Sequence, residues 1–183
     1  MDQAADTDIV IVAPRLPEAP GEAAYSAYEI DPLVIETATR LDEALRTAPG
    51  VSTFRRNDSA AANPTIQGLS IRASAPSGAG RALVTLDGQP LNDPFGGWLI
   101  WGAVPPETVA SATVLRGAGA GPYGAGALTG TVQLDERRGQ GALLSLEGGE
   151  RGGLRAAGIG EARSDAWSLM LAASAQHDDG WIP

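Results

Sequence analysis

Glycine recurs at nearly every second position of residues 116–130, in the segment RGAGAGPYGAGALTG. The segment separates two apolar, β-branched runs, ATVLRG and GTVQLD, which we expect to be strands. Glycine has no Cβ, so it accepts positive φ angles and lets one backbone approach another closely. The pattern therefore predicts a tight, glycine-rich hairpin that joins two strands.

A nucleotide-binding loop is the alternative interpretation of the same glycines. Gly119, Gly121 and Gly124 have the spacing G-x-G-x-x-G, but such a loop must open a helix whose N-terminus meets the pyrophosphate. Pro122 and the β-branched Thr131 oppose a helix here. A phosphate-binding lysine is also excluded, because the chain contains no lysine. We therefore assign the glycines a structural role.

Composition excludes several classes of function. A net charge of -9 argues against nucleic-acid binding, which normally requires a basic surface. With no cysteine and a single histidine, His177, the chain offers no thiolate or histidine cluster for a metal, and we expect no cofactor. Its acidic residues do not accompany a nucleophile or a second catalytic group in a recognisable arrangement, so we expect no enzyme activity and no catalytic residue.

Three regions differ in their residue patterns. Residues 1–24 are acidic and rich in proline, which predicts a flexible arm, and they contain one β-branched island, DIVIVAPR. Residues 25–137 predict a compact α/β unit, with a helix in ETATRLDEALRTAPG. Strands are expected in AYSAYEI, VSTFR, PTIQGLSIR, RALVTLDGQPL and, after a brief helical turn, in VPPETVASATVLRG.

Residues 138–183 alternate apolar with polar or small residues in ALLSLEGG, GLRAAGIGEAR and AWSLMLAASAQ. Strands of about nine to eleven residues with this alternation are typical of a barrel that faces lipid on one side. In the last segment one face would carry Trp167, Leu169 and Leu171, and the other Ser168, Ala172, Ser174 and Gln176. A water-soluble antiparallel sheet alternates in the same way, so the pattern alone leaves both interpretations open.

The ordered series of motifs resembles the TonB-dependent outer-membrane receptors. The matching segments are DIVIVAPR, LDEALRTAPGV, PTIQGLSIR, LVTLDGQPLND, VPPETVASATVLRGAGAGPYGAGALTGTVQL, GERGGLRAAGIGEAR and QHDDGW. The resemblance implies an α+β plug domain with a small mixed β-sheet and short helices, followed by the first antiparallel strands of a transmembrane β-barrel. The family's barrels have about twenty-two strands, so we expect this chain to be a fragment or a truncated product, with the rest of the barrel outside it. Isolated in water, residues 138–183 would be poorly ordered or prone to aggregation.

The resemblance also implies a function, a location and partners. The expected function is active uptake of a scarce ligand, most commonly a ferric siderophore, through the outer membrane of a Gram-negative bacterium, with TonB as the energy-coupling partner and membrane lipid around the barrel. The alternative is a soluble periplasmic binding or signalling module without a barrel. We expect TonB to pair with an unpaired apolar strand in the arm, by strand addition; the other interpretation is a terminus with no coupling role. The residues of this coupling segment are Ile9, Val10, Ile11, Val12 and Ala13.

Two loops at the expected outer end of the plug are candidates for ligand contact. ASAPSGAG is small and flexible, whereas NDPFGGWLIW combines flat apolar side chains with polar groups, as binding sites do. The ligand-binding candidates are Asn92, Asp93, Phe95, Trp98 and Trp101. The alternative for the aromatic residues is packing against the plug core or the barrel wall.

Arg72 and Arg116 lie at the ends of expected strands. By resemblance they would pair with carboxylates of the barrel and hold the plug in place, since a buried arginine without a partner is costly. The alternative is that both are solvated charges at strand ends.

Overall fold

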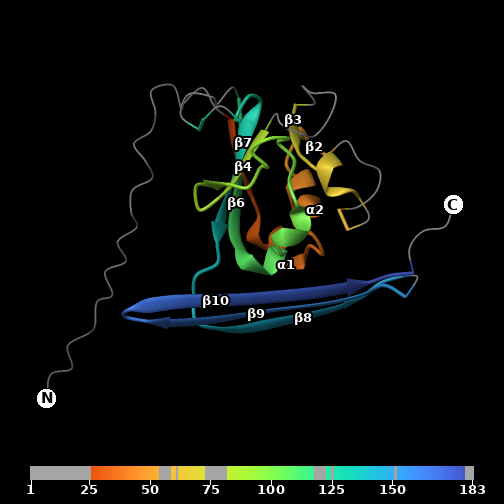
Figure 1. Cartoon of the computed structure of the whole chain (residues 1–183), viewed down its shortest axis with the longest axis vertical. Helices are drawn as coiled ribbons and strands as arrows, with labels where there is room; N and C mark the ends of the chain where they lie inside the picture. Colours follow the sequence, from red (N-terminus) through yellow and green to blue (C-terminus); the bar gives the residue numbers. More distant parts are fainter. Residues whose placement is uncertain are drawn as a thin grey trace, which may run out of the picture.

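The structure, a computed structural model, describes residues 26–53, 59–60, 62–72, 82–117, 123–124, 126–150 and 152–179. The coupling segment and the ASAPSGAG loop lie outside these residues. The chain forms an N-terminal unit, made of the described residues up to position 137, and a C-terminal sheet of three strands that crosses one end of this unit (Figure 1). None of the helices in the described residues is long and apolar enough to cross a membrane.

A five-stranded mixed sheet is the centre of the N-terminal unit. It has the order β1-β6-β7-β4-β5, and its strands are β1 (Ser26–Ile30), β4 (Ala82–Leu86), β5 (Gln89–Pro90), β6 (Val109–Arg116) and β7 (Gly130–Glu136). Only β4 and β7 pair in parallel. The predicted pairing of β6 with β7 is confirmed, with Arg116 opposite Gly130. Residues 117–129 connect them, so the connection is longer than the tight hairpin we expected.

Two short helices replace the single predicted one. They are α1 (Pro32–Thr37) and α2 (Leu41–Arg46). Helix α1 begins earlier than expected because Asp31 caps it, with Oδ1 accepting from the backbone N–H of Leu33 at 2.9 Å. Ala38 and Arg40 are both extended, which interrupts the helix and turns the chain between α1 and α2.

The remaining elements of the N-terminal unit are short. They are the strands β2 (Val51–Ser52) and β3 (Ser70–Ile71), which pair with each other, and the 3₁₀ turns η2 (Pro64–Ile66), η3 (Trp101–Ala103) and η4 (Pro106–Thr108). The strand predicted for PTIQGLSIR is thus confined to its last part. Asn63 Oδ1 accepts from the backbone N–H of Thr65 at 3.0 Å, and this turn opens η2 where a strand was expected.

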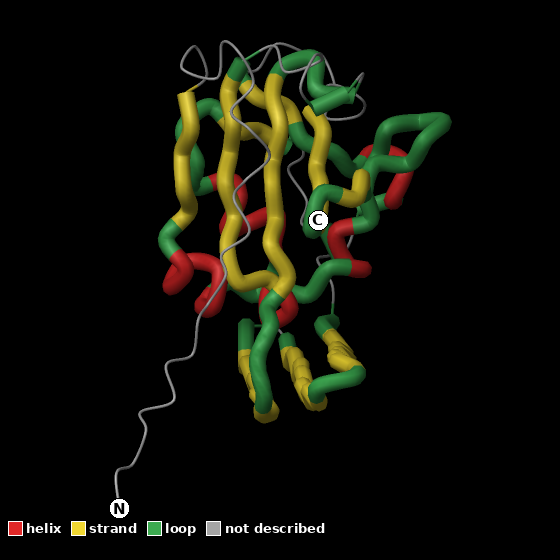
Figure 2. Tube along the Cα trace, turned by 90° about the vertical axis from the view of Figure 1, so that its left-hand side faces the viewer, coloured by secondary structure: helices red, strands yellow, loops and turns green. Residues whose placement is uncertain are grey.

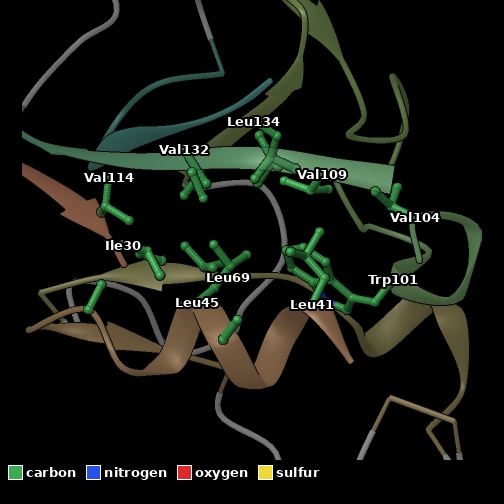
Figure 3. Packing of buried hydrophobic residues seen from close by; sticks show 14 of the residues in the cluster. Ile30, Leu41, Leu45, Leu69, Trp101, Val104, Val109, Val114, Val132 and Leu134 are labelled. Atoms are coloured by element: carbon green, nitrogen blue, oxygen red, sulfur yellow. The ribbon is translucent and has the colours of Figure 1, made fainter. Parts of the chain in front are cut away.

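The core lies between the five-stranded sheet and α2 (Figure 3). Leu41 and Leu45 of α2 face Val114, Val132 and Leu134 of the sheet, and all five side chains are almost fully buried. Burial of each such side chain stabilises the fold by about 1.5–3 kcal/mol. This packing holds α2 against strands β6 and β7 of the five-stranded sheet.

The C-terminal sheet has the order β10-β9-β8 and is entirely antiparallel. Its strands are β8 (Gly141–Gly148), β9 (Leu154–Ser164) and β10 (Trp167–His177), which confirms the three strands predicted from alternation. Figure 2 shows these strands nearly end-on below the N-terminal unit, and Figure 1 shows α1 at the end of that unit nearest to them. Strand β9 also contacts η4. One face of the sheet is therefore turned toward that unit.

Candidate functional site

Asn92 ties the loop of residues 91–101 to β4. Its Oδ1 accepts from the backbone N–H of Val84 at 2.8 Å, and its Nδ2 donates to the carbonyl oxygens of Ala82 at 3.2 Å and Gly97 at 3.1 Å. The side-chain amide of Asn92 thus directs its Nδ2 donors and its Oδ1 acceptor to the protein's own backbone. The structure places Asn92 as the residue that positions the loop.

Asp93 shapes the tip of the same loop. Its Oδ1 accepts from the backbone N–H groups of Phe95 at 3.0 Å and Gly96 at 2.8 Å, a turn that aspartate commonly forms. A bond from the N–H of Gly97 to the carbonyl oxygen of Asp93, at 2.8 Å, closes the turn. Phe95 is consequently held at the tip with 97% of its surface exposed.

The two tryptophans of the loop differ in environment. The ring of Trp98 is partly exposed and covers Gly96 so closely that a Cβ on this glycine would collide with it. Trp101 is only 3% exposed and packs in the core, so the core-packing alternative describes its position (Figure 3). Between them lies an apolar cavity of about 290 Å³, with Leu91, Trp98, Ile100, Trp101 and Val104 in its lining.

The side chain of Asn92 lies toward the end of the five-stranded sheet that is remote from the C-terminal sheet. Asn92 bonds to the beginning of β4, whereas the chain leaves the opposite end of the sheet, after β7, to enter β8. The structure thus places Asn92, Asp93, Phe95 and Trp98 in one loop, with Trp101 buried behind them. Their role in ligand contact remains a prediction.

A buried ion-pair network joins the N-terminal unit to the C-terminal sheet. Arg155 of β9 donates to both carboxylate oxygens of Glu107 in η4, at 2.7 and 2.9 Å, and to Glu147 of β8 at 2.8 Å. The side chains of Arg155 and Glu107 are 7% and 9% exposed. Thr39, between α1 and α2, donates to the second oxygen of Glu147 at 2.7 Å. Glu107 of η4 and Glu147 of β8 therefore meet at Arg155 of β9, and Thr39 joins the network through Glu147.

No sequence pattern predicted this network. Glu107 is one of the acidic residues for which the sequence shows no catalytic arrangement, and Arg155 is one arginine among many in a chain without lysine. The alternation of β9 puts Arg155 on the same strand face as Ala157 and Ile159, but Glu161 and Arg163 share that face. No local pattern therefore distinguishes Arg155 as the buried charge.

The two predicted contact arginines have other neighbours in the structure. Arg116 donates from Nη2 to Ser26 Oγ at 2.5 Å and from Nη1 to the carbonyl oxygen of Pro49 at 3.3 Å, both within the N-terminal unit. Arg72 is exposed, has a φ of 61°, and donates its backbone N–H to Gly50 at 2.7 Å. Contact of either with a barrel wall remains a prediction.

The two faces of the C-terminal sheet differ in chemistry. The face toward the N-terminal unit carries Glu147, Arg155 and Gln176, which lie opposite one another in register. On the other face, large apolar side chains are between 50% and 74% exposed. They are Leu144, Leu146, Leu154, Trp167, Leu169 and Leu171. An exposed apolar surface of this kind is typical of a face that contacts a membrane or another protein.

Comparison with known proteins identifies similar sequences and folds. A family model described as TonB-dependent Receptor Plug Domain matches residues 22–131. The ferrienterobactin receptor of Escherichia coli (strain K12) is 30% identical over 148 residues, which cover 74% of this chain and 19% of the relative. The chain thus spans about a fifth of the length of that curated relative.

Two solved structures share the fold. The siderophore receptor PirA from Pseudomonas aeruginosa has a TM-score of 0.56 and 25% identity, covering 88% of this chain and 29% of its own. The ferric citrate transporter FecA, in its unliganded form, has a TM-score of 0.63 and 20% identity, covering 84% of this chain and 26% of its own. The similarity extends over both the N-terminal unit and strands beyond it.

Proposed function

This chain belongs to the TonB-dependent receptor plug domain family, and from that premise we propose that it is the plug and first barrel strands of an outer-membrane receptor that imports a ferric siderophore. The N-terminal unit is the plug, and the C-terminal sheet is the beginning of the barrel wall. Proteins that match it by sequence or fold are named as receptors or transporters for ferrienterobactin, siderophores and ferric citrate.

The two-faced C-terminal sheet is the observation that carries this proposal. Its inner face is joined to the plug by a buried ion pair, and its outer face presents six large apolar side chains. A barrel strand in lipid needs this arrangement, because every outward side chain meets hydrocarbon. A soluble periplasmic module would leave the same apolar surface in water, which disfavours that alternative.

In this proposal the ligand is contacted by the loop that Asn92 and Asp93 hold in shape. Phe95 presents a flat apolar surface at the tip, and Trp98 flanks it. Aromatic rings bury a large area with little loss of conformational freedom, so they suit the planar chelating groups of a ferric complex. Asn92 and Asp93 position the loop, since their side chains are engaged with its backbone.

In this proposal the partner protein pulls on residues 9–13. These residues pair with the edge of a sheet in the partner as an added strand. The proline-rich residues 14–24 would serve as the tether that lets this segment reach the partner. TonB is the proposed partner, and the cell outer membrane is the proposed location.

Uptake of candidate ferric complexes by a receptor-deletion strain tests the proposal. Deletion of residues 9–13 should abolish import while leaving ligand binding unchanged. Phe95→Ala should weaken binding by about 0.5–1.5 kcal/mol, as expected for one aromatic contact. Leu33→Ala is the matched control, because Leu33 is 62% exposed on α1, outside this loop. Import that persists without residues 9–13 would show that the coupling assignment is wrong.

A further inference from the structure

Strand β1 is the first structural element after the arm, and it lies at the edge of the five-stranded sheet. We propose that Arg155 is a positioning residue that, together with Glu107, Glu147 and Thr39, confines the movement of the plug during import to the segment that begins with β1 and ends before Thr39. This inference rests on the proposed function, in which traction is applied to residues 9–13.

The attachment of β1 is limited. It pairs only with β6, over five residue pairs from Ser26 opposite Arg116 to Ile30 opposite Ala112, and its other edge has no strand partner among the described residues. Ile30 is the one residue of β1 that is fully buried. At the end where force would enter, the hydrogen bond from Arg116 to Ser26 Oγ adds one side-chain contact.

The next contact along the chain after β1 is a network of side-chain hydrogen bonds and ion pairs, not a strand pairing. Thr39 is tied to Glu147 of the wall, and Glu147 in turn is bound by Arg155. Arg155 also donates two parallel hydrogen bonds to Glu107, and this bidentate geometry fixes the position and orientation of the two side chains relative to each other. Because the arginine and Glu107 are almost fully buried, water does not compete for these bonds.

The positions of the β1–β6 pairs and of the Thr39–Glu147 contact along the chain determine how much of the plug the pulling force can separate. Force applied to the arm reaches the β1 pairs first, and an edge strand separates locally without disruption of the rest of the sheet. Once β1 has separated, the pulling force acts on the connection between α1 and α2. This connection is held to the wall by the hydrogen bond from Thr39 to Glu147. Helix α2 and strands β6, β7 and β4 lie beyond this point and remain in place.

Thiol labelling in cells that import ligand tests the inference. The 183 residues contain no cysteine, so single substitutions report on one site of this chain. Ile30→Cys and Leu45→Cys are a matched pair, because both residues are in the same core cluster and at most 1% exposed, but one precedes Thr39 and the other follows it. We expect Ile30→Cys to label about tenfold or more faster during import than after deletion of residues 9–13, and Leu45→Cys to stay unlabelled.

Arg155→Met in the Leu45→Cys background separates positioning from a merely structural role. The methionine removes the charge that holds the anchor, so Leu45→Cys should become labelled during import. Its labelling should be faster during import than after deletion of residues 9–13, whereas the loss of stability caused by the substitution would by itself raise labelling equally in both conditions. Equal labelling of Ile30→Cys and Leu45→Cys with Arg155 intact would overturn the inference.

A disulfide lock provides an independent measurement. Glu29 and Thr113 face each other across β1 and β6, and Thr113 also faces Gln133 across β6 and β7. Oxidised Glu29→Cys/Thr113→Cys should stop import reversibly and leave ligand binding intact, whereas Thr113→Cys/Gln133→Cys should allow import. Import through the first lock would overturn this inference alone. Import without residues 9–13 would instead overturn the proposed function.

Discussion

Arg155 and Glu107 form a bidentate ion pair, with nitrogen–oxygen distances of 2.7 and 2.9 Å, at the contact between the C-terminal sheet and η4. Neither side chain is more than a tenth exposed. Two carboxylates share the single guanidinium, because Glu147 also accepts from it at 2.8 Å. The N-terminal unit is therefore joined to the C-terminal sheet by a charge whose loss would leave the buried carboxylate of Glu107 without compensation.

Arg155→Met should destabilise the assembled receptor by about 3–5 kcal/mol, the usual cost of removing one partner from a buried pair. The double variant Glu107→Leu/Arg155→Met should lose less than Arg155→Met, because Glu107 is no longer left uncompensated. Thermal unfolding of the purified receptor in detergent measures both. Arg137→Met is the control: its partner Glu36 is half exposed, so its loss should cost below about 1 kcal/mol.

Gly130→Ala should impair folding of the plug. A Cβ at this position would collide with the carbonyl oxygen of Leu115 and lie 2.7 Å from Cδ1 of Ile71. Because the obstacle includes backbone of the neighbouring strand, we expect a cost of about 1–3 kcal/mol or more. Gly102→Ala is the matched control, since nothing lies within 4 Å of its Cβ. Unfolding midpoints that shift equally for both variants would contradict the argument.

Asp87→Asn should lower stability near neutral pH and have little effect in acid. The backbone N–H of Glu136, followed by the hydrogen bond and charge of Arg138, lowers the pKa of Asp87 below its ordinary value of 3.8. A lowered pKa means that the carboxylate stabilises the fold above the ordinary pKa, and that this stabilisation is lost as pH falls through the native pKa. Melting temperatures of wild type and variant, measured from about pH 7 to about pH 3, should converge at the acidic end. A difference that is constant with pH would show that the carboxylate charge is not the cause.

Leu169→Glu should reduce the amount of receptor assembled in the membrane, whereas Ser168→Glu should not. These adjacent residues of β10 point to opposite faces of the sheet, and both are exposed. Arg or Lys on the lipid face costs about 2–4 kcal/mol at mid-membrane, and Glu costs less. On the inner face, Ser168 lies opposite Arg163, which favours a carboxylate. Heat-modifiability of the outer-membrane fraction measures assembly, and equal loss in both variants would contradict a lipid-facing Leu169.

Local residue patterns were sufficient to predict most strands. The alternation of residues 141–177 predicted β8, β9 and β10, and the glycine-flanked runs predicted the pairing of β6 with β7. The helix predicted over residues 36–50 is confined to α2, because extended residues break it and separate α2 from the short helix α1. Its break lies next to Thr39, whose hydroxyl is engaged by Glu147, a residue distant in the sequence.

The sequence by itself determined which segments are strands, which loop is rich in aromatic residues and which face of each late strand is apolar, because these follow from the identity and spacing of neighbouring side chains. Only the tertiary structure decided that Trp101 packs in the core while Phe95 stands exposed, and that Arg155 meets Glu107. Such relationships depend on how separate elements pack against one another. A side chain's burial and partners are set by residues far away in the chain, and no local pattern encodes them.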